Sequence, residues 1–143
     1  MKYEEKIEIL LRYRDAEKSA RYYRQEVEQY KATQEQAKIQ RVTGMPTAHG
    51  NNRDLSDYIV KLSEMETEMY SRLEIAENLK LQIMIWIEML KNVDERLVLQ
   101  YKYLQCHNTG WIADEMHYSP RTVERKHYKA VMHLPEPDKV VAL

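Results

Sequence analysis

Phenylalanine is absent from this sequence of 143 residues, and glycine, proline and cysteine are scarce, with three, four and one residues respectively. Few glycines and prolines mean few tight turns, and a charged share of 31 % suits long helices with solvated faces. The single cysteine, Cys106, excludes an intramolecular disulfide and favours a reducing compartment. An apolar share of 43 % argues against disorder throughout the chain. The composition therefore predicts an all-α protein.

Long apolar runs are also missing. Residues 1–6 are polar and charged, so they do not resemble the apolar core of a signal peptide. The most apolar stretch, residues 79–90, is interrupted by Lys80, Gln82 and Glu88 and is too short and too polar to span a bilayer. We therefore expect a soluble, cytoplasmic protein without a membrane partner.

The formal net charge is only −1, but basic side chains are concentrated late in the chain. Arg121, Arg125, Lys126 and Lys129 lie between residues 119 and 134, where Glu124 is the only acid. A local basic patch is what docking on a phosphate backbone requires, whatever the total charge of the molecule is.

Two sets of mostly apolar residues recur at spacings of three and four, the heptad pattern of helices that pack along one face. The first set is Ile9, Tyr13, Ala16, Ala20, Tyr23, Val27 and Tyr30. The second set is Leu62, Met65, Met69, Leu73, Ala76, Leu79 (or Lys80), Ile83, Ile87 and Leu90. These sets predict one helix over about residues 3–41 and another from Asp54 or Ser56 to about residue 90.

A loop over about residues 43–53 is expected to join the two helices. Gly44 can take the left-handed conformation that ends a helix, and Pro46 prevents its continuation. The helices are expected to fold back as an antiparallel, coiled-coil-like hairpin over residues 1–91. Their apolar faces fit either the core of a monomer or a contact between subunits. Because residues 79–90 are apolar on more than one face, that end is expected to meet the C-terminal domain, a second subunit, or both.

The pattern changes to short helices after Asn92. One helix is predicted from residue 93 to about 104, followed by a break at residues 106–108. Asn108 or Thr109 can cap the next helix, which contains Trp111. Trp111 and Trp86 are both interpreted as core anchors.

A three-residue turn, 117–119, is predicted to precede the last helix. Ser119 suits its N-cap and Pro120 its first position, which predicts a helix over residues 120–133. Residues 135–143 are expected to form a flexible tail. The small Ala113 permits a close approach of the two helices at the turn. Together these features predict a small helix-turn-helix domain over residues 92–134.

Helix 120–133 is predicted to have an inward and an outward face. The inward residues are Val123, His127, Ala130 and Leu134. Arg121 and Arg125 are candidates for reading bases, because the arginine fork matches O6 and N7 of guanine. The other outward candidates for base contacts are Glu124 and Tyr128. The residues predicted to contact phosphates are Ser119, Thr122, Lys126 and Lys129. The predicted partner is double-stranded DNA.

Residues 90–134 resemble region four of bacterial sigma factors, through the segments 90–96 (LKNVDER), 112–113 (IA) and 119–123 (SPRTV). The whole layout, including Gly-Met-Pro at residues 44–46, is similar to phage and prophage late-gene transcriptional regulators of the RinA and ArpU type. The resemblance implies a transcription activator at a phage promoter in a bacterial host cell, with Arg121, Glu124 and Arg125 at groove-facing positions. The sequence departs from the family where His117 replaces a frequent glycine and Glu124 a frequent basic residue.

Two other functions fit the same layout: a small terminase subunit that acts in phage DNA packaging, and an interaction module that binds RNA polymerase. A homo-oligomer is expected, with a dimer favoured. The sequence has no phosphate-cradling glycine-rich loop and no nucleophile elbow, and its histidines and Cys106 lack a zinc spacing. We therefore expect no enzyme activity, no catalytic residues, no metal and no cofactor.

Overall fold

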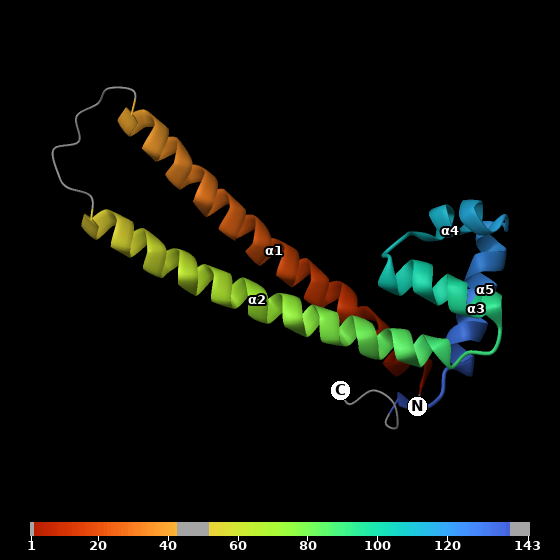
Figure 1. Cartoon of the computed structure of the whole chain (residues 1–143). Coiled ribbons are helices and arrows are strands. Elements are labelled where there is room, and N and C mark those ends of the chain that lie inside the picture. The colour runs from red at the N-terminus through yellow and green to blue at the C-terminus, as the bar shows by residue number, and fades with distance from the viewer. Residues whose placement is uncertain (1, 43–51, 138–143) are drawn as a thin grey trace. The chain divides into compact units, whose positions relative to one another are not determined.

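A computed structural model describes residues 2–42 and 52–137 of the chain. Every regular element in these ranges is a helix, which confirms the all-α prediction for the described residues (Figure 1). The elements are α1 (Tyr3–Val42), α2 (Asn52–Glu88), α3 (Val93–Leu99), the π-helix η1 (Gln100–Leu104), α4 (Thr109–Met116) and α5 (Pro120–His133). None of the described helices is both long and apolar enough to cross a membrane.

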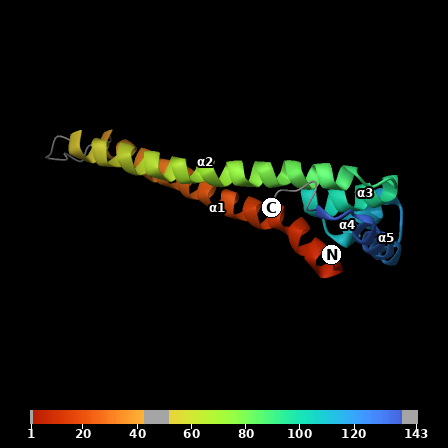
Figure 2. The ribbon, with the colours of Figure 1, turned by 90° about the horizontal axis from the view of Figure 1, so that it is seen from below.

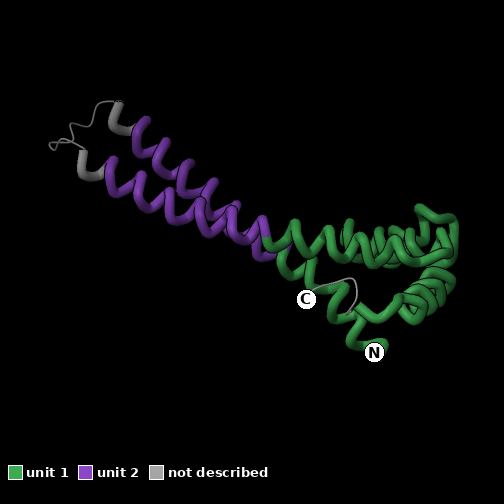
Figure 3. Tube along the Cα trace, turned by 60° about the horizontal axis from the view of Figure 1, so that its bottom comes forward, with its two compact units in different colours: residues 1–16, 75–143 green, residues 17–74 purple. Residues whose placement is uncertain are grey.

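The chain divides into two compact units (Figure 3). Unit 1 comprises residues 1–16 and 75–143, and unit 2 comprises residues 17–74. The sequence predicts a boundary between residues 91 and 92, whereas the units divide inside α1 and α2. The reason is that the start of α1 and the end of α2 pack with the later helices of unit 1, as the contacts of Lys6 and Trp86 show.

In unit 2, α1 and α2 lie side by side, as Figure 2 also shows from a second direction. Tyr30 stacks on Tyr58 with ring centroids 5.3 Å apart, and Lys31 pairs with Glu66 at 3.8 Å. The heptad residues buried in this unit are Ala20, Val27 and Met69. These three positions of the predicted apolar faces are therefore covered within the chain, while the neighbouring heptad residues are half-buried.

The start of α2 differs from the prediction. The helix begins at Asn52, ahead of the predicted caps Asp54 and Ser56. Local cap preferences do not decide such a boundary, because helix ends shift by one or two residues at small cost. The rest of the predicted loop, residues 43–51, lies outside the described residues.

The core of unit 1 is built around the end of α2. Trp86, Ile83 and Ile87 are fully buried there, which confirms Trp86 as a core anchor. The indole Nε1 of Trp86 donates to the backbone oxygen of Pro135 at 2.9 Å, and Pro137 is also buried. The first residues of the expected tail thus lie packed in unit 1, while residues 138–143 lie outside the described ranges.

Lys6 joins the start of α1 to the end of α5. Its Nζ donates to the backbone oxygens of Leu134 at 2.7 Å and of Met132 at 3.4 Å, and the side chain is buried. The last carbonyls of a helix lack partners within the helix and carry partial negative charge. The buried ammonium group therefore caps α5 from a segment more than a hundred residues earlier in the chain.

Asparagine side chains start two of the short helices. Oδ1 of Asn92 accepts from the backbone N–H of Glu95 at 3.1 Å, and Oδ1 of Asn108 accepts from that of Trp111 at 2.8 Å. The predicted break at residues 106–108 is confirmed, with Asn108 rather than Thr109 as the cap. The π-helix η1 was not predicted from the sequence, because its wider turn leaves no distinct apolar spacing.

Candidate nucleic-acid interface

A tight turn joins α4 to α5 and consists of the three predicted residues, 117–119. His117 takes the left-handed conformation, with φ of 60°. The backbone N–H of Tyr118 donates to the oxygen of Ala113 at 3.0 Å, which closes the end of α4. The turn that often uses glycine is thus built with histidine, a residue that tolerates positive φ better than most.

The N-terminus of α5 confirms the predicted cap. Oγ of Ser119 accepts from the backbone N–H of Thr122 at 3.2 Å, and Pro120 occupies the first turn. The two hydroxyl oxygens of Ser119 and Thr122 lie 2.9 Å apart. Both residues remain at least partly exposed, so their hydroxyls retain hydrogen-bonding capacity toward a ligand.

The inward face of α5 is buried as predicted at Val123, Ala130 and Leu134. Val123 belongs to a small apolar cluster with three other buried residues of unit 1: Val98, Ile112 and Ala113. Ala113 therefore lies where α4 and α5 approach each other. Val131 is also fully buried and was not among the predicted inward residues. The buried side chains of Val123, Ala130, Val131 and Leu134 therefore hold α5 in the core.

His127 is the polar residue of the inward face. Its Nε2 lies 2.6 Å from the hydroxyl oxygen of Tyr103 in η1, and its Nδ1 lies 3.5 Å from that of Tyr3 in α1. Burial, together with the charge of Lys102, lowers the pKa of His127 to about 4. Burial also raises the pKa of the Tyr103 phenol. At neutral pH an uncharged imidazole therefore joins α5 to η1.

The outward face of α5 carries Arg121, Arg125 and Lys129, which we call the basic row. All three are exposed, and their spacing of four residues places them along one side of the helix. Within the part of the chain that the structure describes, their side chains form no hydrogen bond or ion pair. Three cations therefore face solvent from a helix whose opposite side is anchored in the core.

The remaining predicted base-reading residues lie on the same helix in different surroundings. Tyr128 is exposed, but its ring lies against that of Tyr3, with centroids 5.2 Å apart. Glu124 is exposed and near Lys102. Burial lowers the pKa of Lys102, the charge of Arg14 lowers it further, and the charge of Glu124 opposes both. Tyr128 is thus in contact with α1, and the charge of Glu124 acts on Lys102 of η1.

Lys126 differs from the basic row because it is engaged within the protein. Its Nζ lies 3.3 Å from Oδ2 of Asp94 and 4.9 Å from the centre of the Tyr118 ring. The hydroxyl of Tyr118 donates to the same carboxylate oxygen at 2.6 Å. That hydrogen bond is the main cause that lowers the pKa of Asp94, and Lys126 adds to it. Asp94 therefore links α3, the turn and α5, a role not predicted from the sequence.

Trp111 is not a core anchor, contrary to the prediction. Its side chain is 38 % exposed and stacks on the imidazole of His107, with ring centroids 3.5 Å apart. Tyr101 packs edge-on against both rings. The buried positions of α4 are Ile112 and Ala113, so Trp111 falls on the adjoining, solvent-facing side of this short helix.

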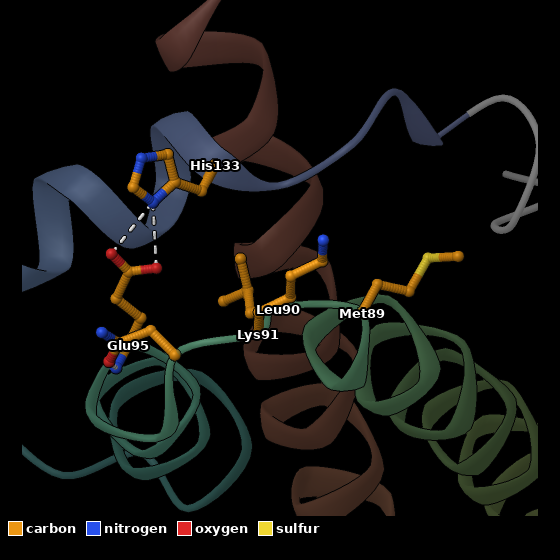
Figure 4. Close-up of a pocket in the computed structure, with 6 residues that line it drawn as sticks. Met89, Leu90, Lys91, Glu95 and His133 are labelled. Atoms are coloured by element: carbon orange, nitrogen blue, oxygen red, sulfur yellow. Dashed lines mark hydrogen bonds and ion pairs between the residues drawn. The ribbon is translucent and has the colours of Figure 1, made fainter.

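The C-terminal end of α5 carries a further polar contact, seen in Figure 4. Nδ1 of His133 lies 2.9 and 3.0 Å from the two carboxylate oxygens of Glu95 in α3. The pair borders a pocket of about 360 Å³ whose other lining residues are Met89, Leu90, Lys91 and Asn92. In the described ranges, no three His, Cys, Asp or Glu side chains gather as metal ligands would.

No protein-family model, curated protein or solved structure matches this chain. The geometry of unit 1 and the chemistry of its exposed side chains are therefore the basis for a functional proposal.

Proposed function

We propose that the chain is a sequence-specific DNA-binding transcriptional regulator of the phage late-gene activator type. In this proposal α4 and α5 act as a helix-turn-helix, and α5 lies in the major groove of double-stranded DNA. The observation that carries the proposal is the basic row. Arg121, Arg125 and Lys129 are exposed and without side-chain partners among the described residues, on a helix that is fixed from behind by Val123 and Ala130.

The proposed roles follow from the chemistry of each side chain. Arg121 and Arg125 each present a planar fork of donors that matches O6 and N7 of guanine. Lys129 presents a compact charge that suits a phosphate. Ser119 and Thr122 lie at the start of α5, where hydroxyl donors and the positive end of the helix both favour a phosphate.

Three other predicted contacts have a smaller part in the proposal. Glu124 is proposed to accept from N4 of cytosine, and Tyr128 to contact a base edge beyond Arg125. Lys126 is proposed as a weaker phosphate contact, because Asp94 already offsets its charge. The two long helices are proposed to form an antiparallel hairpin that carries the reading domain.

The proposal is tested by selecting bound sequences from random DNA with the purified full chain at a stated salt concentration. Binding of the selected site is then measured for Arg121→Ala plus Arg125→Ala. Each bidentate contact is worth about 1–3 kcal/mol, so the double variant is expected to bind at least about 30-fold more weakly. Arg12→Ala plus Arg24→Ala, which removes two exposed arginines from α1, is the matched control and is expected to bind normally.

Other outcomes identify the competing functions. Unchanged DNA affinity of the double variant overturns the proposal. If RNA polymerase is still retained by that variant, an interaction module without base reading replaces it. A closed ring of many subunits that binds DNA without a preferred sequence favours a small terminase subunit.

A further inference from the structure

An apolar stripe remains uncovered on the part of α2 that belongs to unit 1. Leu81, Ile85 and Met89 are 48 %, 54 % and 50 % exposed. Their spacing of four residues aligns them in one row along the helix and its last turn. The opposite face of the same segment, with Ile83 and Ile87, is fully buried in unit 1. Single exposed apolar residues are normal, whereas a continuous row marks an interaction surface.

We infer that this stripe is the contact surface between two copies of the chain, which cross their α2 helices in antiparallel directions at Ile85. Such a contact is isologous, so each stripe residue meets its symmetry equivalent or the residue at the opposite end. Met89 then lies beside Leu81 of the second copy. Interdigitation of rows spaced by four residues is the commonest way in which two helices pack.

The charges that flank the stripe favour a second copy in this orientation. Glu77 precedes Leu81 by four residues, and Lys91 follows Met89 by two, and both are exposed. An antiparallel crossing brings the end of the stripe that Lys91 follows in one copy to the end that Glu77 precedes in the other, and does so twice by symmetry. A parallel pairing would instead place like charges together. The stripe is thus complementary to itself only in the antiparallel arrangement.

The acid nearest the middle of the stripe does not oppose this contact. Oε1 of Glu88 accepts from the side chain of Gln100 at 2.9 Å, and Oε2 lies 3.7 Å from Arg96. Its charge is therefore partly compensated within the same copy. At the C-terminal end of the stripe, Met89 and Lys91 border the pocket of about 360 Å³ (Figure 4). The surface there is therefore concave and has room for side chains of the second copy.

The contact is tested by sedimentation equilibrium of the full chain without DNA, over a range of concentrations. We expect a dimer, and we expect Ile85→Glu to raise its dissociation constant at least about 100-fold, since each dimer contains two copies of the change at the centre of the contact. Ile59→Glu is the matched control, because Ile59 is 55 % exposed on the same helix in unit 2. Far-UV circular dichroism checks that both variants keep the helical content of the wild type.

The orientation is tested by exchanging charges. Lys91→Glu alone and Glu77→Lys alone are each expected to weaken the dimer. The double variant Lys91→Glu plus Glu77→Lys is expected to return close to the wild-type dissociation constant, because the opposite charges meet again. A wild-type chain that stays monomeric, or a dimer that Ile85→Glu weakens no more than Ile59→Glu, overturns the inference. A double variant that is not restored overturns the antiparallel pairing. None of these measurements involves DNA, so the dimer can be supported or overturned independently of the proposed function.

Discussion

Nε2 of His127 lies 2.6 Å from the hydroxyl oxygen of Tyr103, so a hydrogen bond within unit 1 holds the proposed recognition helix against η1. Burial, with the charge of Lys102, lowers the pKa of His127 to about 4, below the usual value of 6.5. Between these two values the unfolded chain binds a proton that the folded chain does not. Stability is therefore expected to rise with pH from about 4 to 6.5 and to gain nothing more from this group above that range.

The expected contribution of His127 is up to about 3 kcal/mol across that window, since one pKa unit corresponds to about 1.4 kcal/mol. Urea unfolding of the wild type and of His127→Gln at several pH values checks it. Glutamine can still bond to Tyr103 but does not titrate, so the difference between the two proteins isolates the imidazole from the carboxylates. Equal pH slopes for the two proteins would contradict the prediction.

The two lysines of α5 are expected to contribute unequally to the salt dependence of DNA binding. Each phosphate contact contributes about one unit to the slope of log affinity against log salt. Lys129→Ala is expected to lower that slope by about one unit, because Lys129 has no side-chain partner among the described residues. Lys126→Ala is expected to lower it by less, because its charge is already paired with Asp94 at 3.3 Å.

Asp94→Asn supplies the control for this prediction. Without the carboxylate charge, Lys126 becomes available to a phosphate, so binding is expected to tighten and the slope to steepen. In that background Lys126→Ala should cost about a full unit of slope. Equal effects of the two lysine substitutions in the wild-type background would show that Asp94 does not restrain Lys126.

Local chemistry explains which parts of unit 1 could be predicted from the sequence. The cap at Ser119, the proline that follows it and the inward positions Val123 and Ala130 depend on residues within one or two helical turns of each other. Such signals depend on residues that are close in the sequence, so they can be recognised without knowledge of the tertiary structure. The exposed position of Arg121 in the candidate interface could be predicted for the same reason, because it follows from the same helical periodicity.

Long-range contacts explain what the sequence did not predict. Lys6 caps α5 although it precedes Leu134 by 128 residues, and no spacing in the chain encodes that pairing. The prediction that Trp111 is a core anchor is wrong for a different reason. In an eight-residue helix only two positions are buried, and the neighbouring Ile112 and Ala113 occupy them. A large apolar side chain at the edge of so small a core stacks on His107 instead.

The left-handed conformation of His117 is expected to make glycine the better residue there for stability. A non-glycine residue with φ of 60° carries roughly 1–2 kcal/mol of strain, which glycine would relieve. The greater freedom of glycine in the unfolded chain offsets about 0.5–1 kcal/mol of that gain in stability. His117→Gly is therefore expected to be neutral or to stabilise by up to about 1.5 kcal/mol in urea unfolding.

Two further substitutions decide whether that effect is specific to the turn. Glu115→Gly, at an exposed position inside α4, should cost about 1 kcal/mol, so the same new residue has the opposite effect two positions away. His117→Val should also destabilise, because a branched side chain tolerates positive φ poorly. A loss of stability in His117→Gly as large as that in Glu115→Gly would count against a strained turn.

The close approach of α4 and α5 at Ala113 is expected to be intolerant of larger side chains. Ala113 is buried in the cluster with Val98 and Val123, so Ala113→Leu must displace its neighbours and is expected to cost about 1–3 kcal/mol. Glu115→Leu introduces the same side chain at an exposed position of α4 and should change stability by no more than about 0.5 kcal/mol. Because the overpacking pushes α5 away from α4, Ala113→Leu is also expected to weaken DNA binding under conditions where the protein remains folded. Full affinity in that variant would mean that the spacing of the two helices does not matter for the proposed contact with DNA.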